Sequence, residues 1–532
     1  MSFRSALVLV AFTGFNALSF EILWSRLYSF LSASRAPAFA GMLGFYLLGL
    51  ALGSLWSIRF QKRHETGNND SRNAAVARLV LQANAAAFLL APVVSWAAMV
   101  MPYGFTYPLV MLVSGVMGTL LPLICHFSMP PDARVGSRLS KIYLANIAGS
   151  GAGSLLTGFV LMEYLPLRWI SLLLLAISAG IFIMLHPAGG LRCRARHTAL
   201  KVLAAGVILT PLLHWQFWER IQKDPSWHWN MGQPFATVIE SRSGVIAVTA
   251  ENLSATPPQP AYIFGGGAYD GVIAVKPALN EWLVRAYCLS ALHSNPEEVL
   301  MIGLSGGSWG QIVAANPQVK RLTIVEINHS YNQVIAAHEC VRSLLSNPKV
   351  EIIIDDGRRW LERNPDRKFD AILMNTTHHW REFAGNLLSA DFLKIASSHF
   401  RPHGIFQYNT TDSARVARTA LDAFPHAMMV LNNVVISPDE LHFDRARWQP
   451  VLENYEIDGR RMFDPADARD QEVLKKMLLL PDTLGKDPAA CAALSPLLAR
   501  EPKYRLQNRA QMEATAAGAR PITDDNLGHE YE

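Results

Sequence analysis

Residues 299–328 read VLMIGLSGGSWGQIVAANPQVKRLTIVEIN, and this stretch decides the fold of the C-terminal half of the chain. The apolar run Val299–Ile302 leads into the glycine-rich segment Gly303–Ser308, and a second apolar run, Leu322–Val325, ends in Glu326. A helical stretch lies between the two runs. This order predicts a strand, a tight turn, a helix and a second, parallel strand. The glycines let the backbone approach a nucleoside, and the acid about twenty residues on can accept both ribose hydroxyls.

Three more strands are predicted downstream of this unit. Val350–Ile354 ends in Asp355-Asp356-Gly357-Arg358, Ala371–Met374 ends in Asn375-Thr376-Thr377-His378-His379-Trp380, and Gly404–Tyr408 follows the helix Leu388–His399. Alternation of strands and helices predicts a doubly wound, mostly parallel sheet, which binds its ligands at the carboxyl ends of the strands. Ser305, Glu326, Asp356 and Asn375 all fall on that edge. The alternative is a structural α/β domain in which these residues merely cap helices.

A small β region precedes this domain. Residues Thr237–Val248 alternate and are rich in β-branched residues, with Ser241–Gly244 as a turn, and Ala261–Ile263 forms a further extended piece. This pattern predicts a hairpin region. Pro277–His293 then predicts an amphipathic helix, because a proline is tolerated at a helix start.

The N-terminal half has the composition of a membrane domain. Half of the residues are hydrophobic and only 17% are charged, below the quarter that is usual in soluble proteins, and before about Trp218 the charges cluster between long apolar runs. A membrane-spanning helix needs about 20 apolar residues. On that rule the sequence predicts spans at Ser5–Phe30, Ala38–Ile58, Ala74–Met101, Phe105–Phe127, Ile142–Met162, Trp169–Leu185 and, shorter than the others and holding Pro211 and His214, Val202–Trp218.

Basic residues indicate the orientation of these spans. They cluster after the second, fourth and sixth spans, at residues 62–72, 134–141 and 192–201. The positive-inside rule therefore places the N-terminus and these loops in the cytoplasm. The expected location of the protein is the cell (inner) membrane. Six spans would leave the C-terminal domain in the cytoplasm, whereas seven would place it outside. The need for a nucleoside cofactor favours the cytoplasm.

Two features inside the spans are open to more than one interpretation. Glu21 and Arg26 are ionisable groups in an apolar run, so they form either a polar substrate or lipid-headgroup site or an internal ion pair. The small residues of 146–158 (Asn146, Gly149, Gly151, Gly153 and Gly158) predict close helix packing.

Charge and cysteine patterns exclude other classes of function. The net charge is +5, but many basic residues lie between apolar runs, so we expect the lipid bilayer as a partner and no nucleic acid. The five cysteines show no CxxC spacing, and we expect no metal site. The predicted domains are a transmembrane domain (1–218), a linker with the β region (219–275), a nucleoside-binding domain (276–446) and a C-terminal helix and loop extension (447–532).

Motifs along nearly the whole chain resemble the membrane-fused spermidine synthase-like family. GFNALSFEILWSR, YLLGLALGS and YLANIAGSGAGSLLTGF resemble its spans, and the soluble half follows its order with VLMIGLSGG, VEIN, DDGRRWL, FDAILMN, LLSADFLKIASSHFRPHGIF and TDDNLGHEYE. The resemblance implies a Rossmann-like domain of the methyltransferase type. It also implies aminopropyl transfer from decarboxylated S-adenosylmethionine to an amine, leaving methylthioadenosine, as in polyamine synthesis. The residues implied in binding the donor are Gly303, Ser305 and Gly307 near the nucleoside, Glu326 on the ribose, and Asp356 with Gly357 at the adenine.

The chain departs from the family where the acceptor would be activated. Asn375 stands where a carboxylate normally removes the proton of the amine, Ser305 replaces a glycine, and His378-His379 occupies an acidic stretch. The candidate catalytic residues are therefore Asn375, His378 and His379, since a histidine can act as a base at neutral pH. Each histidine could equally be a surface or helix-capping residue. The C-terminal tail could fold back over the site, where Asp524, Asp525, Glu530 and Tyr531 would supply acidity, or it could be an exposed end.

Other functions fit the same pattern. An S-adenosylmethionine-dependent methyltransferase acting on a small amine or a lipid, and a non-catalytic nucleoside-binding membrane sensor, are the alternatives to aminopropyl transfer. In each case decarboxylated S-adenosylmethionine or S-adenosylmethionine is the expected nucleoside. The sequence does not determine the acceptor or the oligomeric state, and a homo-oligomer is one of the possible states.

Overall fold

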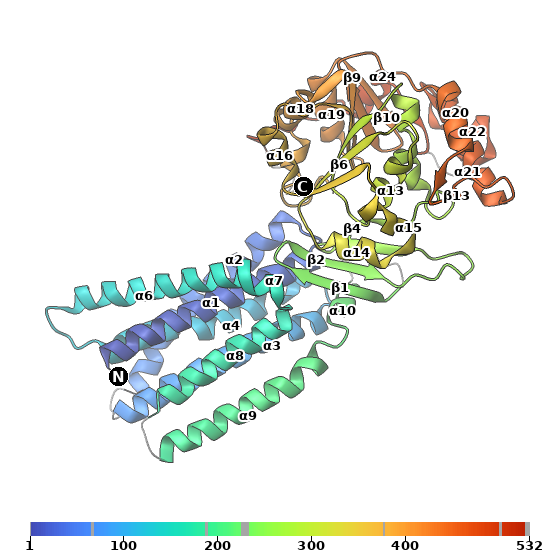
Figure 1. Cartoon of the computed structure of the whole chain (residues 1–532). Coiled ribbons are helices and arrows are strands. Elements are labelled where there is room, and N and C mark those ends of the chain that lie inside the picture. Colours follow the sequence, from blue (N-terminus) through green and yellow to red (C-terminus); the bar gives the residue numbers. More distant parts are fainter. Residues whose placement is uncertain are drawn as a thin grey trace. The chain divides into compact units, whose positions relative to one another are not determined.

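The computed structural model describes residues 2–64, 69–186, 190–224, 233–375, 378–499 and 503–526. The chain forms two compact units, Met1–Val245 and Ile246–Glu532 (Figure 1).

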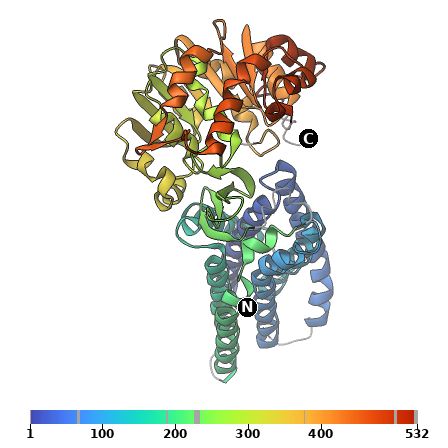
Figure 2. The ribbon, with the colours of Figure 1, turned by 90° about the vertical axis from the view of Figure 1, so that its right-hand side faces the viewer.

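The first unit is helical, and within the described residues seven helices are long and apolar enough to cross a membrane. They run alongside one another (Figure 2). The predicted series of long apolar helices is therefore confirmed, and their crossing of a membrane stays a prediction. The helices are α1 (Phe3–Leu31), α2 (Ala36–His64), α3 (Asn69–Ala97), the segment of η1 (Tyr103–Thr106), α4 (Tyr107–Gly118) and α5 (Leu120–Ser128), the segment of α6 (Val135–Leu156), η2 (Thr157–Leu161) and α7 (Met162–Tyr164), α8 (Leu167–Met184), and α9 (Gly190–Leu213), after which comes the short α10 (Phe217–Ile221).

The seventh helix differs from the predicted span. We expected a crossing at Val202–Trp218 after a basic loop, but α9 begins at Gly190 and ends at Leu213. The basic residues at 192–201 thus lie inside the helix. Arginine, lysine, alanine and leucine are all strong helix formers, so nothing in this stretch ends the helix early.

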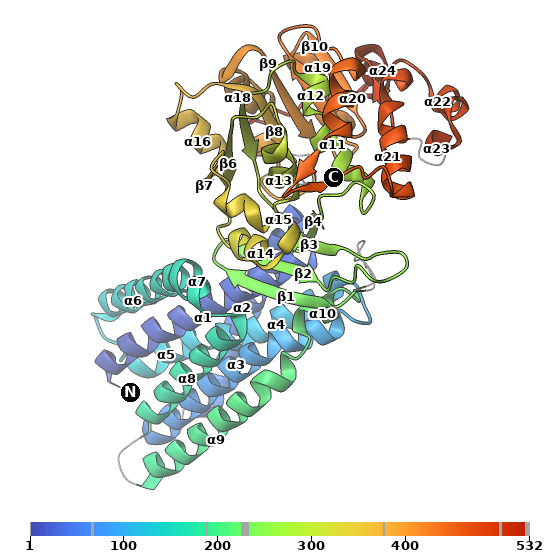
Figure 3. The ribbon, with the colours of Figure 1, turned by 45° about the vertical axis from the view of Figure 1, so that its right-hand side comes forward.

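Small residues bring helices of this unit into close contact, as predicted. A methyl group on Gly149 or Gly153 of α6 would overlap the backbone oxygen of Ala11 or Phe15 of α1, and the two helices lie side by side (Figures 1 and 3). Gly151 has open space at its Cα. Within the stripe, Gly149 and Gly153 therefore serve the packing, whereas Gly151 and Gly158 do not.

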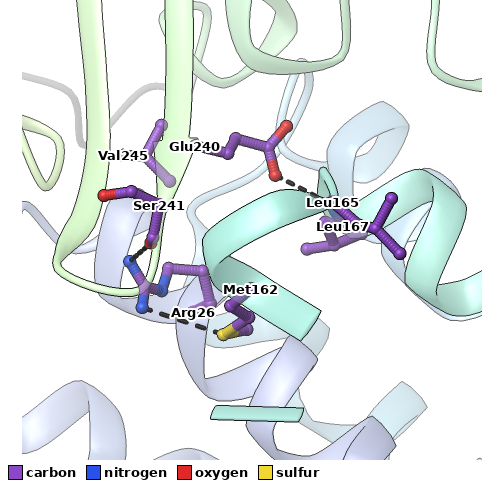
Figure 4. A pocket seen from close by; sticks show the side chains of 7 residues that line it. All are labelled: Arg26, Met162, Leu165, Leu167, Glu240, Ser241 and Val245. Carbon is purple, nitrogen blue, oxygen red and sulfur yellow. Dashed lines mark hydrogen bonds between the residues drawn. The ribbon is translucent and has the colours of Figure 1, made fainter. Parts of the chain in front are cut away.

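Glu21 and Arg26 have separate partners. Glu21 shares a hydrogen bond with Tyr46. Arg26 donates to the backbone oxygens of Ser241 at 3.1 Å and Arg242 at 2.7 Å, and it lines a small pocket (Figure 4). Burial raises the pKa of Glu240, which also lines this pocket and accepts the Leu167 N–H at 2.8 Å. Arg26 therefore satisfies backbone groups at the end of its span.

The small β region is confirmed. β1 (Phe235–Ser241) leads through a turn into β2 (Gly244–Thr249), and β2 pairs antiparallel with β3 (Ala261–Gly265), which pairs antiparallel with β4 (Ala268–Ile273). The register shifts between Ile263 and Phe264, a β-bulge.

The second unit is built on a mixed eight-stranded sheet in the order β14-β10-β11-β9-β8-β5-β6-β7. Neighbours from β9 to β7 pair in parallel, whereas β10, β11 and β14 are antiparallel, an edge that the sequence did not predict. The chain winds from β5 first toward β7 and then toward β9, so the switch point lies at β5 and β8. The strands are β5 (Glu298–Ile302), β6 (Arg321–Glu326), β7 (Val350–Ile354), β8 (Phe369–Met374), β9 (Phe400–Asn409), β10 (His426–Val430), β11 (Asn433–Ser437) and β14 (Leu506–Gln507), with a separate pair β12 (Glu456–Ile457) and β13 (Arg460–Arg461).

Helices cover both faces of this sheet (Figure 2). The Rossmann-like fold of the methyltransferase type is thereby confirmed. The helices are η3 (Glu281–Leu283), α11 (Val284–Tyr287), α12 (Leu289–Leu292), α13 (Ser308–Ala315), α14 (Tyr331–Ala337), α15 (Glu339–Arg342), η4 (Ser343–Ser346), α16 (Gly357–Arg363), α17 (Gly385–Leu388), α18 (Ala390–Ser397), α19 (Ala414–Ala423), α20 (Arg445–Glu453), α21 (Ala468–Leu478), η5 (Leu480–Thr483), α22 (Pro488–Leu494), α23 (Pro496–Ala499) and α24 (Arg509–Thr515).

One detail of these elements corrects the sequence expectations, and a second adds to them. The single helix predicted over Pro277–His293 is three short turns that begin at Glu281, because Asn280 caps the first turn by accepting the Trp282 N–H. The C-terminal residues also join the main core, where Met512 and Ile522 lie fully buried in the cluster that holds Phe392.

Candidate functional site

The glycine-rich loop between β5 and α13 is held in a left-handed backbone conformation. Gly303 has φ 89° and Gly307 φ 80°, where glycine carries no steric penalty. Ser305 has φ 48°, and for a residue with a side chain this costs roughly 1 kcal/mol. The Gly303 N–H donates to the Val325 backbone oxygen at 2.9 Å, which fixes the loop beside the end of β6.

Glu326 closes this loop from the tip of β6. Its Oε2 accepts the Leu304 N–H at 2.7 Å and its Oε1 accepts the Asn328 N–H at 2.7 Å. The side chain is 5% exposed, and burial raises the pKa of Glu326 to about 7 against the opposing effect of the two N–H donors. The residue is thus a buried carboxyl at the carboxyl edge of the sheet, where its protonation changes near neutral pH.

Asp270 is a second acid against the same loop, and the sequence analysis missed it. Ser305 Oγ donates to the Asp270 backbone oxygen at 2.9 Å, and the Tyr331 hydroxyl donates to Asp270 Oδ2 at 2.5 Å. Burial raises the pKa of Asp270, while the nearby guanidinium of Arg381 lowers it. A single acid in the strand sequence Ala268–Ile273 is the signal that could have found it, but this strand lies outside the predicted Rossmann unit.

Ser308 fixes β4 to the start of α13. Its Oγ donates to the Val272 backbone oxygen at 2.6 Å and accepts the Ala274 N–H at 3.1 Å. A side chain on Gly306 would overlap Ile273. Contacts of β4 with Ser305, Gly306 and Ser308 therefore fix the position of Asp270 relative to the glycine loop.

Asp356 and Gly357 lie at the tip of the neighbouring strand, β7, where Asp356 caps a helix and Gly357 allows close packing. Asp356 caps α16 by accepting the Arg359 N–H at 2.8 Å, and a side chain on Gly357 would overlap Ile302 of β5. The Asp355 N–H donates to the Glu326 backbone oxygen at 3.1 Å, so the two strand tips lie together. Contact of Asp356 with an adenine stays a prediction.

The tip of β8 carries the candidate acceptor residues. Asn375 Oδ1 accepts from the Asn409 side chain at 3.3 Å, and Asn409 Oδ1 accepts the Thr411 N–H at 2.8 Å. Thr411 Oγ1 lies 2.7 Å from His379 Nδ1. Asn375 and His379 are therefore joined through the tip of β9, whereas Thr376 and Thr377 lie outside the described residues.

The Thr411 hydroxyl determines the tautomer of His379. When its single proton goes to the Thr410 backbone oxygen at 2.8 Å, Oγ1 is an acceptor for His379. His379 Nδ1 must then carry the proton of the neutral ring, and Nε2 carries the lone pair. This is the form that a general base needs.

His378 is held differently. Its Nε2 lies 3.2 Å from the Tyr269 backbone oxygen, and its ring stacks on Trp380 with the centroids 4.9 Å apart. Since a carbonyl only accepts, Nε2 is the protonated nitrogen. His378 thus contacts β4 at Tyr269, the residue that precedes Asp270.

The C-terminal segment reaches the same edge. Asp524 accepts from the Arg358 guanidinium at 2.9 Å and 2.5 Å and from Ser389 Oγ at 2.7 Å. Arg358 follows Asp356 and Gly357 directly. Glu530 and Tyr531 lie outside the described residues, and within the described part of the chain no group of three or more His, Cys, Asp and Glu side chains is placed to hold a metal ion.

Comparisons with known proteins point to one kind of domain. Residues 286–423 match the family model described as "Spermine/spermidine synthase domain". Polyamine aminopropyltransferase 2 of Hyperthermus butylicus is 30% identical over 128 residues, 24% of this chain and 41% of the relative. The polyamine aminopropyltransferase of Mycobacterium tuberculosis is 24% identical over 312 residues, 55% of this chain and 56% of the relative. The chain thus spans about half the length of these relatives.

The chain is also similar to a solved structure. A spermidine synthase in complex with the transition-state analogue AdoDATO covers 47% of this chain and 87% of its own, with 16% identity and a TM-score of 0.35. The family match falls on the part of the sheet that carries Glu326, Asp356 and Asn375. Within the C-terminal part of this chain, residues 286–423 form a spermine/spermidine synthase domain with distant polyamine aminopropyltransferase homologues, and a set of long apolar helices precedes it.

Proposed function

We propose that the protein is a membrane-bound transferase that takes an adenosyl-sulfonium donor, decarboxylated S-adenosylmethionine, and passes its aminopropyl group to an amine. The observation that carries the proposal is the buried carboxyl of Glu326 at the end of β6, fixed by the backbone N–H groups of Leu304 and Asn328. It lies in the domain whose relatives are named as aminopropyltransferases.

The residues at the strand tips fit such a donor. Glu326 would accept the ribose hydroxyls, and the left-handed loop at Gly303, Ser305 and Gly307 leaves its backbone open to the nucleoside. Asp356 and Gly357 at the tip of β7 would lie beside the adenine. When bound, the donor supplies a sulfonium leaving group: the amine nitrogen forms a bond to the adjacent carbon, and the electron pair of the broken C–S bond leaves with the thioether methylthioadenosine.

The protein must orient the acceptor amine and take its proton. We assign the proton to His379 Nε2, because Thr411 holds Nδ1 in its protonated form. Asn375, held by Asn409, would orient the amine through its side-chain oxygen. His378 would shape the site, since its Nε2 is directed at the Tyr269 backbone oxygen.

Asn375 also favours a second candidate function. A neutral amide cannot compensate the charge of a polycation as the usual carboxylate would. S-adenosylmethionine-dependent methyl transfer to a less charged acceptor, a lipid among them, fits this feature with the same donor residues.

We further propose that the domain lies in the cytoplasm, where the donor is made. The charge-free part of α9 is residues 202–213, about 18 Å of helix against a hydrocarbon core of about 30 Å. An α9 that packs alongside α8 without crossing the whole bilayer leaves six crossings, with the domain on the same side as the N-terminus.

Identification of the products tests the chemistry. The purified full-length protein is incubated with each donor and with putrescine, spermidine or a lipid extract as acceptor. Aminopropyl transfer predicts methylthioadenosine from the decarboxylated donor. S-adenosylhomocysteine from S-adenosylmethionine would instead identify a methyltransferase, and binding without either product would leave a nucleoside sensor.

A further inference from the structure

We propose that Asp270, oriented by Tyr331, binds the ammonium group at the end of the donor's three-carbon chain. This inference rests on the proposed function and assigns a new binding residue within the same site. The shared chemistry is a primary ammonium carried on a sulfonium nucleoside, which both decarboxylated S-adenosylmethionine and S-adenosylmethionine possess.

Three segments of the second unit converge on the Asp270 carboxylate. Tyr331, the first residue of α14, donates its hydroxyl to Oδ2 at 2.5 Å. Gly265 at the end of β3 leaves room for both groups, because a methyl group there would lie 2.5 Å from the Tyr331 hydroxyl and 3.2 Å from Asp270 Oδ2. Arg381 donates to the Gly265 backbone oxygen at 2.9 Å. The glycine is therefore required for the acid and the tyrosine to meet.

The glycine loop places Asp270 on the correct side of the nucleoside. In folds of this type the acid after the second strand takes the ribose, while the substituent at the 5′ end lies over the glycine loop. Ser305 of that loop donates to the Asp270 backbone oxygen, and Leu304 beside it donates to Glu326. The two acids thus flank one loop, with Glu326 on the ribose side and Asp270 on the side of the 5′ substituent.

Charge complementarity identifies what Asp270 would bind. A carboxylate has about four acceptor positions, and the Tyr331 hydroxyl takes one of them. Asp270 is half-buried, and its negative charge adds to the effect of burial in raising the pKa of Glu326. A cationic group between the two acids offsets this repulsion and forms charge-assisted hydrogen bonds with Asp270. Neutral methylthioadenosine has no ammonium group and gains nothing from Asp270.

The test measures binding, not turnover. Calorimetry on the full-length protein in detergent gives the Kd of decarboxylated S-adenosylmethionine, S-adenosylmethionine and methylthioadenosine for the wild type, Asp270→Asn and Tyr331→Phe. Asp366→Asn is the matched control, since Asp366 is exposed before β8 and loses the same charge. Thermal unfolding of each variant verifies that it is folded.

We expect Asp270→Asn to raise the Kd of the sulfonium donor at least tenfold and that of methylthioadenosine less than twofold. Asp366→Asn should leave both Kd values unchanged. Tyr331→Phe should show the same selectivity at about threefold. An equal loss for donor and methylthioadenosine, or no loss, overturns the role of Asp270. The same holds if the wild type binds methylthioadenosine but neither donor. A wild type that binds none of the three refutes the proposed function itself.

Discussion

Glu326 Oε2 accepts the backbone N–H of Leu304 at 2.7 Å, so the acid at the end of β6 is hydrogen-bonded to the loop that follows β5. With the Asn328 N–H on Oε1, both carboxyl oxygens face N–H donors of the backbone. The contact joins the two parts of the predicted nucleoside site.

Replacement of Glu326 by Gln should destabilise the domain. The amide nitrogen of Gln would face one of the two N–H donors and leave a buried donor without an acceptor, a cost of about 1–3 kcal/mol. We expect a lower Tm for Glu326→Gln in thermal unfolding. The exposed control Glu362→Gln should melt like the wild type, and a Glu326→Gln protein that does so too would contradict the assigned contacts.

Nucleoside binding should weaken as the pH falls through neutrality. Burial raises the pKa of Glu326 to about 7, and only the ionised form accepts both backbone N–H groups and the ribose hydroxyls. Below pH 7 a bound proton must first be released, so affinity should fall about tenfold per pH unit well below the pKa. The Kd of methylthioadenosine from pH 5.5 to 8.5 tests this, with Glu326→Gln as the variant that should lose the dependence. Affinity that rises toward acid pH would refute the assignment.

The two adjacent histidines should differ in catalysis. His379→Ala removes the nitrogen placed to take the proton, and we expect kcat to fall at least a hundredfold with KM changed less. His378→Ala should cost less than tenfold, since its Nε2 is occupied by Tyr269. Steady-state rates with the accepted amine compare the two variants. A greater loss for His378→Ala would reverse the roles.

Asp524 should contribute to the stability of the domain. The side chain binds Arg358 and Ser389, and Arg358 holds the pKa of Asp524 below its usual range. A depressed pKa means that the contact stabilises the fold above the unfolded pKa and is lost as the pH falls through the folded value. Asp524→Asn should therefore lower the Tm at pH 7, and the difference from the wild type should shrink as the pH falls below 4. Its exposed neighbour Asp525→Asn serves as the control, and equal melting of the two variants at pH 7 would contradict the role.

A reporter that is active only outside the cytoplasm tests the side of the domain. We expect no activity from a fusion after Glu532 and activity from a fusion after Arg35, between the first two spans. Activity of the Glu532 fusion would show that α9 crosses the membrane.

Local patterns were sufficient to predict the main architecture. The glycine turn, Glu326 and the strand periodicity predicted the parallel half of the sheet, because each signal lies within about thirty residues of sequence. Contacts between distant segments were not predictable in this way. The antiparallel edge includes β14, a strand of two residues, and its pairing with β10 depends on tertiary packing that no short motif encodes.

The candidate site divides in the same manner. Residues at strand tips could be named from the sequence. Asp270 stands out there only as a single acid in a strand, because its relation to the loop depends on a hydrogen bond to Ser305, 35 residues away. The sequence also did not predict that Asp356 caps α16 or that Gly357 packs against Ile302, since both roles depend on neighbours in space.

The most direct test of the central claim is calorimetric titration of the wild-type, full-length protein with methylthioadenosine at pH 8, beside Glu326→Gln. We predict saturable binding at one site per chain, weakened at least tenfold by the substitution while Asp366→Asn leaves it intact. The absence of binding to the wild type, or equal binding by Glu326→Gln, would contradict a ribose held at the tip of β6.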